Sequence, residues 1–435
     1  MANFGTDGIR APAGSAQVCP ESFVSYGGAI AQLCKQVFHC GSIWIANDGR
    51  NSAASLVAAL NSGLLAHGVE VYDAGVLPTP GLAYLAKQHA AVGIMITASH
   101  NPWHDNGMKL FSPEGVKFSP QQQHDFKQAL LKKQPYAAKW AKVVDKKNEA
   151  RRQYLQMLTD YCKSAHLNLN GTKIVLDCAN GATHYVAAEL LTAIGATVVA
   201  LNQQRDGCKI NAECGSTSPQ ALQAEVLAQS ADIGIAFDGD GDRLLLVDHN
   251  ANIIDGDGIL YLLALTADPK PKGVVTSIMS NAGLSPALEK HGIKLERGPV
   301  GDQAIRQLLL QHGWSLGGEP SGHIIILPQS QSGDGLFAVC ACLDALIKSG
   351  RTLAQWHKSW ERHPQKIMNL ARVDGSVGES FVAEVNGLAK AQGLHLHVRH
   401  SKTEPVWRVL ISAKTPQVVA SFARVIEQKY QQILV

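Results

Sequence analysis

The residues best suited to chemistry are three aspartates that alternate with glycine near the middle of the chain. Asp238, Asp240 and Asp242 stand in the run DGDGDR, which ends in Arg243. Glycine permits unusual backbone angles, so three carboxylates at this spacing can converge on one cation. Oxygen ligands suit Mg²⁺ or another hard divalent ion. The EF-hand pattern fails, because its sixth position is Arg243 and its twelfth is His249. A polar turn without metal is the alternative, but carboxylates this close repel one another unless a cation neutralises them.

A candidate nucleophile lies in a second polar loop. Ser99 follows the apolar run 92–96 and stands in the segment TASHNP, a loop that ends at Asn101-Pro102. A hydroxyl nucleophile needs exposure, an activating neighbour and charge stabilisation. Lys109, a short distance downstream, offers a charge that can neutralise a phosphoryl group or move a proton. We expect Ser99 to be an exposed nucleophile; the alternative for such a serine is a helix cap.

Two further segments carry groups that bind sugars and phosphates. Glu319, Ser321 and His323 alternate in GEPSGH, and sugar hydroxyls need carboxylate and hydroxyl partners, while a histidine can move a proton. The segment 399–405, RHSKTEP, gathers an arginine, a lysine and two hydroxyls, which a phosphate requires. The plainer alternatives are a histidine that caps a turn and a solvated run of surface charge.

These loops need elements that bring them to one place, and the sequence repeats a suitable unit. β-Branched runs at residues 43–46, 174–177 and 274–278 each precede a helix-period segment, a glycine and a second strand, which is typical of α/β units with buried parallel strands. In each unit a later strand leads into a polar, glycine-rich loop. Ligands bind at the carboxyl ends of strands in such sheets, so we expect the loops to face one cleft. The differing helix-to-loop spacings leave open that the repetition is a generic α/β pattern.

The last part of the chain follows another plan. Short alternating runs at 394–398 and 406–411 precede a helix from about residue 415, which indicates a smaller α+β domain. We predict three repeated α/β domains with mixed, largely parallel sheets around a central cleft, followed by this C-terminal domain. The expected boundaries are 1–150, 151–252, 253–364 and 365–435, each with one of the chemical loops.

Composition excludes several classes of protein. The net charge is +3 and charged residues make up 17%, which gives no sign of a nucleic-acid or polybasic membrane partner. No apolar stretch reaches the length of a membrane span, and the N-terminus lacks the pattern of a secretory signal. The odd number of cysteines, nine, contains no CxxC. We therefore expect free thiols and a cytoplasmic protein.

Together these motifs resemble the α-D-phosphohexomutase family over essentially the whole chain. The matching pieces are FGTDGIR near the N-terminus, TASHNP, DGDGDR, GEPSGH and RHSKTEP, in the family's order. The resemblance implies four domains around a cleft, the first three of common topology. The segments NPWHDNGMKLF and LDCANGATHYVA and residues 214–217 are most similar to members that interconvert glucosamine 6-phosphate and glucosamine 1-phosphate.

The resemblance also implies a role for each site residue. Ser99 carries a phosphoryl group, and one Mg²⁺ per subunit lies between Ser99 and the three aspartates. A hexosamine phosphate and its bisphosphate intermediate are the ligands, in a monomer or homodimer. The residues implied in charge stabilisation, proton transfer or catalysis are Arg10, His100, Lys109, Arg243 and His323. Those implied in substrate binding are Glu319, Ser321, Arg399, Ser401, Lys402, Thr403 and Arg408.

Two positions depart from the glucosamine-specific pattern. Pro320 stands where glutamine is usual, and Lys402 stands where glycine is usual. A phosphomannomutase or phosphoglucomutase of the same family is therefore an alternative. A second alternative is a phosphatase in which Asp238 would be the nucleophile. The motif of such phosphatases also has two aspartates, two positions apart, after a buried strand, as at Asp238 and Asp240. A catalytically silent sugar-phosphate sensor would have lost residues such as Ser99 and Lys109, which are present.

Overall fold

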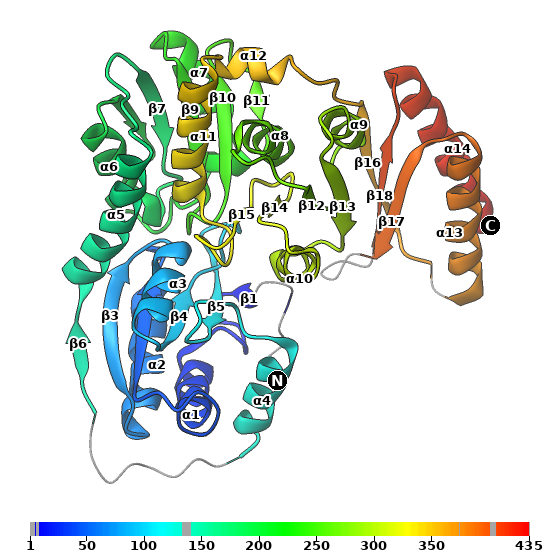
Figure 1. The fold of residues 1–435 in the computed structure, drawn as a ribbon. Helices are drawn as coiled ribbons and strands as arrows, with labels where there is room; N and C mark the ends of the chain where they lie inside the picture. Colours follow the sequence, from blue (N-terminus) through cyan, green and yellow to red (C-terminus); the bar gives the residue numbers. More distant parts are fainter. Residues whose placement is uncertain (1–4, 6–7, 133–140, 374, 401–405, 435) are drawn as a thin grey trace.

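The structure is a computed structural model that describes residues 5, 8–132, 141–373, 375–400 and 406–434. The chain forms four sheets with their own helices (Figure 1). The first three are mixed and largely parallel, and the fourth is antiparallel. The expected fold class is confirmed. Among the helices of the described residues, none combines the length and apolarity that a bilayer crossing needs.

The first domain is a sheet with helices on both faces. Its elements are β1 (Ile9–Pro12), α1 (Pro20–Gln36), β2 (Ser42–Asn47), α2 (Ala53–Ala66), β3 (Glu70–Val76), α3 (Thr79–Gln88), β4 (Val92–Ile96), β5 (Asp105–Phe111), α4 (Pro120–Leu130) and β6 (Val143–Asp145). The strand order is β1-β5-β4-β2-β3-β6. Successive strand residues point to opposite faces. Ile43 and Ile45 therefore join the core beneath α1, α2 and α4, whereas Trp44 and Ala46 join the core beneath α3.

The second domain repeats this layering on a smaller sheet. Its elements are α5 (Lys147–Ser164), β7 (Lys173–Asp177), α6 (Ala187–Ala193), β8 (Thr197–Leu201), α7 (Gln220–Ala228), β9 (Ile233–Phe237), β10 (Leu244–Asp248) and β11 (Ile253–Ile254), with short 3₁₀ turns at Ala182–Tyr185 and Gly215–Thr217. The strand order is β11-β10-β9-β7-β8. The expected division at 150/151 falls inside α5, which starts at Lys147 and packs against α3.

The third domain has four strands, and the fourth domain has three. The third contains α8 (Gly256–Thr266), β12 (Gly273–Ser277), α9 (Leu284–Glu289), β13 (Lys294–Gly298), α10 (Asp302–His312), β14 (Leu316–Gly318), β15 (Ile324–Ile326), α11 (Gly335–Ser349) and α12 (Leu353–His357). The fourth contains β16 (Gln365–Ala371), α13 (Gly375–Ala391), β17 (His395–His400), β18 (Val406–Ser412) and α14 (Pro416–Leu434). The strand orders are β13-β12-β14-β15 and β16-β18-β17.

One strand pattern recurs in the first three domains. The orders β3-β2-β4-β5, β8-β7-β9-β10 and β13-β12-β14-β15 are equivalent, and in each the last strand alone runs antiparallel. Gly68, Gly195 and Gly292, the expected helix stops, all have positive φ angles of 74°, 99° and 73°. The repeat predicted from the sequence is therefore confirmed as a structural repeat.

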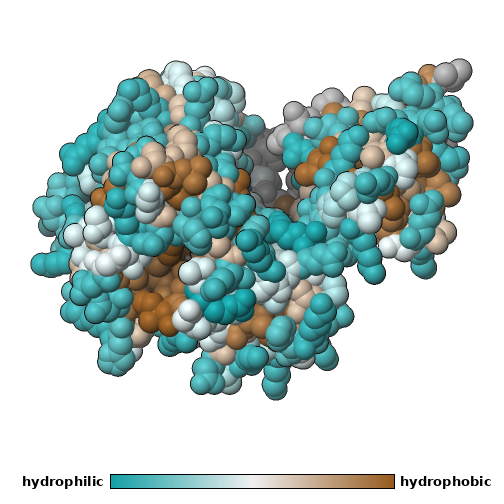
Figure 2. All heavy atoms as spheres, turned by 90° about the horizontal axis from the view of Figure 1, so that it is seen from above, coloured by the Kyte–Doolittle hydropathy of each residue, from teal (hydrophilic) through white to brown (hydrophobic). Residues whose placement is uncertain are grey.

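The hydrophobic cores divide the molecule into a block and a separate lobe. One cluster of buried residues is continuous through the first three domains, from Trp44 through Leu176 to Val274. The fourth domain has its own core, in which Phe381 of α13 stacks on Trp407 of β18. Seen from above, this domain stands apart from the block (Figure 2). The lobe can move relative to the block without breaking either core.

We predict that Gly63→Ala destabilises the first domain, because α1 and α2 touch there through their backbones. A Cβ at Gly63 would lie 2.1 Å from the carbonyl oxygen of Val24 and 3.0 Å from Cα of Gly27. Overpacking of this kind costs about 1–3 kcal/mol, so the thermal unfolding midpoint falls. Gly387→Ala on α13 is the control, since a Cβ there meets nothing within 4 Å. Equal midpoints for the two variants would contradict this account of α1 and α2.

Candidate active site

The three chemical loops occupy the same position in the three repeats. Each connects the third strand of its unit to the antiparallel fourth strand. Residues 97–104 join β4 to β5, residues 238–243 join β9 to β10, and residues 319–323 join β14 to β15. The repeat therefore explains why segments far apart in the sequence share one site, as expected from the carboxyl ends of the strands.

The acidic loop and the serine loop meet directly. One oxygen from each of Asp238, Asp240 and Asp242 lies within 4.8 Å of the others, and all three residues are buried. The hydroxyl of Ser99 donates a hydrogen bond to Oδ2 of Asp238 at 2.7 Å. The expectation that Ser99 is exposed is wrong: its exposed fraction is 0%, because the acidic loop of the second domain covers it.

The three carboxylates repel one another, and nearby cations stabilise the ionised form of Asp242 more than that of Asp238. Burial, together with Asp242 and Asp240, raises the pKa of Asp238 well above its usual range. Burial also opposes ionisation of Asp242, but Lys109 and His323 hold the pKa of that carboxyl well below its usual range. The Lys109 ammonium donates to Oδ2 of both Asp240 and Asp242 at 2.7 Å.

The arrangement fits a hard divalent cation. The Oδ1 atoms of Asp240 and Asp242 are buried and have no hydrogen-bond partner among the described residues. Leaving buried carboxylate oxygens unpaired is costly unless a cation binds them. Three clustered carboxylates, two of them with an unpartnered oxygen, and no sulfur or imidazole in the cluster, are ligands typical of Mg²⁺.

The backbone of Ser99 is held in an unusual conformation. Its φ is +54°, in the left-handed region that non-glycine residues seldom adopt. The N–H of Ser99 donates to the hydroxyl of Thr97 at 2.7 Å, and that hydroxyl donates to Asp48 at 2.6 Å. Strain of this kind persists only where surrounding contacts fix it.

Arg50 is the main support of the serine loop. Its guanidinium is buried, pairs with Asp48 at 2.9 Å and donates to four carbonyl groups of the loop. These carbonyls belong to Ser99, Asn101, Pro102 and Asp105. From the second domain, the Asn211 amide donates to Ser99 O at 2.8 Å and Asn101 O at 3.0 Å. The loop is thus fixed from two domains.

His323 joins the sugar loop to the acidic loop. Its Nδ1 lies 3.6 Å from Asp242, and its Nε2 lies 3.4 Å from Asp302, which also pairs with Lys117 at 2.6 Å. Burial lowers the pKa of His323, but the charges of Asp242 and Asp302 outweigh it and raise that pKa to about 10. The N–H of Gly333, however, donates to Nε2 at 2.9 Å, which requires an unprotonated nitrogen. These opposing contacts suit a group that exchanges a proton.

His100 is neutral by contrast. Burial, with the charges of Arg243 and Arg10, lowers the pKa of His100 to about 3. Its Nδ1 is buried without a partner among the described residues. The structure therefore brings His100, Arg10 and Arg243 together beside the acidic loop, as three groups that can face a phosphoryl oxygen.

The sugar loop is a tight turn built on glycine. The N–H of Glu319 donates to the carbonyl of His323, and Gly322 has φ +88°. A Cβ on Gly322 would lie 1.9 Å from the carbonyl oxygen of Leu244, the first residue of β10. The Glu319 carboxylate accepts from the N–H of Gly301 at 3.2 Å, and Ser321 is exposed.

The C-terminal lobe presents two arginines toward this turn. Arg399 on β17 pairs in register with Arg408 on β18, so their side chains share one face of the sheet. Burial and Arg408 lower the pKa of Arg399, while the charge of Glu319 raises it, which places Glu319 within electrostatic reach. Adjacent like charges favour a bound anion. Ser401, Lys402 and Thr403 lie outside the described residues.

Several supporting residues escape a reading of the sequence. Asp48 and Arg50 stand in the turn that follows β2, and nothing in the sequence of that turn indicates that both side chains are buried. Thr79, Lys117 and Asp302 carry no local pattern. The contacts Thr79–Asp240 and Lys117–Asp302 join residues more than a hundred positions apart.

Arg50→Lys tests the support of the serine loop. A lysine ammonium cannot reproduce the planar guanidinium's separate contacts with Asp48 and four carbonyls. We expect kcat to fall about tenfold to a hundredfold, because displacements of about 1 Å at a reacting group have that effect. The control is Arg152→Lys on the exposed surface of α5. A normal kcat for Arg50→Lys, measured beside the control, would contradict the assigned role.

Three sequence models of the phosphoglucomutase/phosphomannomutase family match this chain. They describe alpha/beta/alpha domain I over residues 1–137, domain II over 152–252 and domain III over 255–363. The matched segments contain the serine, acidic and sugar loops, respectively.

Curated relatives match nearly the whole chain. A phosphoglucosamine mutase of Hydrogenovibrio crunogenus is 39% identical over 434 residues, covering 96% of this chain and 95% of the relative. One of Acinetobacter baumannii is 40% identical over 440 residues, covering 97% of each.

Solved structures share the fold at lower identity. A phosphoglucomutase/phosphomannomutase family protein from Burkholderia thailandensis has a TM-score of 0.81 at 24% identity, covering 98% of this chain and 97% of that chain. The Aspergillus fumigatus N-acetylphosphoglucosamine mutase in complex with GlcNAc-6P and magnesium has a TM-score of 0.70 at 16% identity, covering 99% and 95%. The three matched domains and the relatives near 40% identity show that this protein belongs to the phosphoglucomutase/phosphomannomutase family of α-D-phosphohexomutases.

Proposed function

We propose that this protein is a phosphoglucosamine mutase, an isomerase that interconverts glucosamine 6-phosphate and glucosamine 1-phosphate. The observation that carries the proposal is the hydrogen bond between Ser99 and Asp238 inside a cluster of three buried carboxylates. Relatives of that name at about 40% identity support the choice of substrate. We further propose a cytoplasmic monomer or homodimer that feeds UDP-N-acetylglucosamine synthesis, with no membrane or nucleic-acid partner.

The reaction consists of two phosphoryl transfers through Ser99. A free sugar hydroxyl attacks the phosphorus of the Ser99 phosphate, the new O–P bond forms, and the bond to the serine oxygen breaks. The product is a sugar bisphosphate, which turns over in the cleft and returns its other phosphate to Ser99. The hydroxyl loses its proton in the first transfer, and His323 is the candidate acceptor. The Lys109 ammonium already carries its proton, so it can neutralise phosphoryl charge or donate a proton. Arg10, His100 and Arg243 face the charge that develops on the phosphoryl oxygens.

Asp238, Asp240, Asp242 and the Ser99 phosphate would hold one Mg²⁺. Bound there, the ion supplies Lewis-acid stabilisation of phosphoryl charge. The burial of these residues strengthens each electrostatic interaction. Lys109 orients Asp240 and Asp242 through its two hydrogen bonds and lowers the pKa of Asp242.

The far end of the sugar binds to the C-terminal lobe. We propose that Arg399 and Arg408 hold the substrate phosphate, together with Ser401, Lys402 and Thr403. Glu319 and Ser321 bind ring hydroxyls. The same lobe must release the intermediate and grip its other end, which a separate hydrophobic core allows.

The phosphatase alternative has weaker support. Both oxygens of Asp238 already accept hydrogen bonds, Oδ2 from Ser99 at 2.7 Å and Oδ1 from the N–H of Arg243 at 3.1 Å. A carboxylate nucleophile needs a free oxygen facing the phosphorus. The geometry favours Ser99 as the group that accepts the phosphoryl.

Ser99→Ala should abolish turnover, because among the described residues no other hydroxyl donates to Asp238. The variant leaves Oδ2 of buried Asp238 without this donor, so we expect a stability loss of about 1–3 kcal/mol and a retained fold. Ser62→Ala, on the exposed side of α2, is the control for both measurements. Substantial activity in Ser99→Ala would exclude the proposed mechanism.

Substrate preference is tested by coupled assays with glucosamine 1-phosphate, mannose 1-phosphate and glucose 1-phosphate. We expect kcat/KM for glucosamine 1-phosphate to exceed the other two by at least about tenfold, and no net release of inorganic phosphate. Comparable rates on mannose and glucose phosphates would assign the protein to the phosphomannomutase/phosphoglucomutase alternative. Stoichiometric phosphate release would assign it to the phosphatase.

A further inference from the structure

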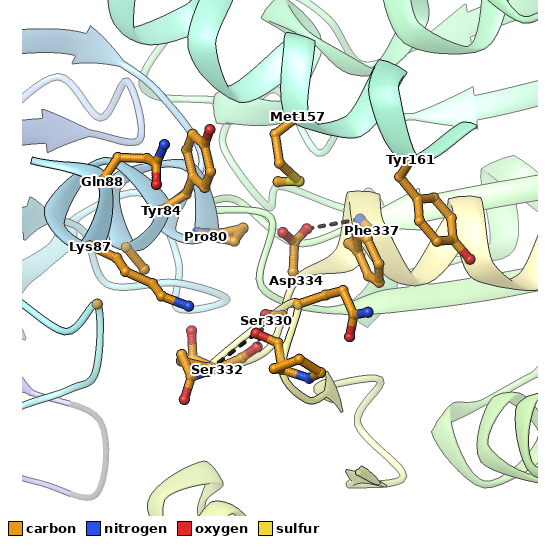
Figure 3. A pocket seen from close by; sticks show the side chains of 15 residues that line it. Pro80, Tyr84, Lys87, Gln88, Met157, Tyr161, Ser330, Ser332, Asp334 and Phe337 are labelled. Atoms are coloured by element: carbon orange, nitrogen blue, oxygen red, sulfur yellow. Dashed lines mark hydrogen bonds between the residues drawn. The ribbon is translucent and has the colours of Figure 1, made fainter. Parts of the chain in front are cut away.

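A cavity of about 310 Å³ lies behind the active site, where the first three domains meet. Its walls come from α3, from α5 and from the loop of residues 328–334 that leads into α11. Figure 3 shows Tyr84 and Lys87 reaching in from α3, Met157 from α5, and Asp334 across from them beside Phe337. None of these residues has a part in the proposed phosphoryl transfer.

One wall of the cavity connects directly to the acidic loop. Pro80, which lines the cavity, follows Thr79 at the start of α3. The Thr79 hydroxyl donates to Oδ2 of Asp240 at 2.5 Å, and its N–H donates to the Asp240 carbonyl at 2.8 Å. A shift of the first turn of α3 would therefore move Asp240.

The opposite wall connects to His323. Ser332 and Asp334 line the cavity, and between them the N–H of Gly333 donates to His323 at 2.9 Å. A Cβ on Gly333 would lie 2.5 Å from the imidazole ring and 2.6 Å from the carbonyl oxygen of Asp242, so this wall packs closely on both. A molecule that touches both walls would bridge two segments that position catalytic groups.

The cavity contains an acidic group without a matching cation. Asp334 is buried, and its Oδ1 accepts from the Tyr154 hydroxyl at 2.8 Å and from the N–H of Phe337 at 2.9 Å. No basic side chain among the described residues forms an ion pair with this carboxylate, although a backbone hydrogen bond from Leu336 also lowers its pKa. Burial raises the pKa of Asp334 to about 6, so the group is largely ionised at neutral pH. A buried carboxylate in this state favours a ligand that brings an ammonium group.

The other side of the cavity offers a cation and a ring surface. Lys87 is exposed at the rim and pairs with no carboxylate among the described residues. Tyr84 is half-buried and provides an aromatic surface, and the Gln88 amide stands beside it. A ligand that complements Asp334, Tyr84 and Lys87 would carry an ammonium group, a polar ring and an anionic group. A phosphorylated amino sugar has all three.

We propose that this cavity is a regulatory site for a hexosamine phosphate, with the ammonium group against Asp334, the phosphate against Lys87 and the ring along Tyr84. This inference rests on the proposed function, which makes the ligand the enzyme's own substrate or product. By contacting α3 and residues 330–334 together, the ligand holds the Thr79–Asp240 and Gly333–His323 contacts in place and raises turnover.

Binding is measured separately from catalysis by isothermal titration of an Arg399→Ala/Arg408→Ala variant, in which the lobe no longer grips phosphate. We expect one molecule of glucosamine 6-phosphate to bind per chain, and glucose 6-phosphate, which lacks the ammonium group, to bind at least about tenfold more weakly. Adding Lys87→Ala should weaken binding about tenfold, whereas the exposed control Lys163→Ala on α5 should leave it unchanged. Asp334 is kept intact because it also caps α11.

Three results would overturn the proposal: no binding to the double variant, equal binding of glucose 6-phosphate, or equal effects of Lys87→Ala and Lys163→Ala. In the wild-type enzyme the rate should rise sigmoidally with the concentration of glucosamine 6-phosphate, and Lys87→Ala should make this dependence hyperbolic; a hyperbolic wild-type curve would contradict activation. Failure of the proposed function is distinct, since the wild-type enzyme would then not turn over glucosamine 1-phosphate at all.

Discussion

The repulsion among three buried carboxylates is the constraint on which the rest of the structure depends. Asp238, Asp240 and Asp242 bring oxygens within 4.8 Å of one another without exposure to solvent. Such a cluster is tolerable only if donors and cations surround it. Lys109 and Ser99, both from the first domain, supply part of that requirement, and a metal ion would supply the remainder. The same electrostatic need that draws the two domains together therefore places the serine hydroxyl beside the metal ligands.

The structural repeat brings three loops with different side chains to one site. Each unit ends its third strand at the site. The loop that follows carries a serine in the first unit, carboxylates in the second and the groups proposed to bind the sugar in the third. A continuous core fixes these three units relative to one another. The C-terminal lobe, which carries the proposed phosphate-binding arginines, has its own core. In the proposed reaction the intermediate is bound first by one end and then by the other. Such a reaction needs reacting groups in fixed positions and a phosphate-binding domain that can move relative to them.

The sequence predicts the repeat, the fold class and the chemical loops, because strand periodicity, glycine stops and carboxylate spacing are local signals. It wrongly predicts an exposed Ser99, since burial there comes from Asp238, Gly239 and Asn211 of another domain. It also gives no indication that Arg50 holds the serine loop or that Lys117 and Asp302 adjoin His323. Those contacts depend on how whole domains pack, which no short pattern encodes.

The most direct test of the account is to identify the residue that carries the phosphoryl group in the working enzyme. The protein would be treated with glucosamine 1,6-bisphosphate and Mg²⁺, quenched in acid and digested, and the phosphorylated peptide would be sequenced by mass spectrometry. The account predicts an acid-stable phosphoserine at Ser99, formed more slowly in an Asp240→Asn variant. An acid-stable label on another serine, or an acyl phosphate at Asp238 detected by borohydride reduction of the native phosphoenzyme, would contradict it.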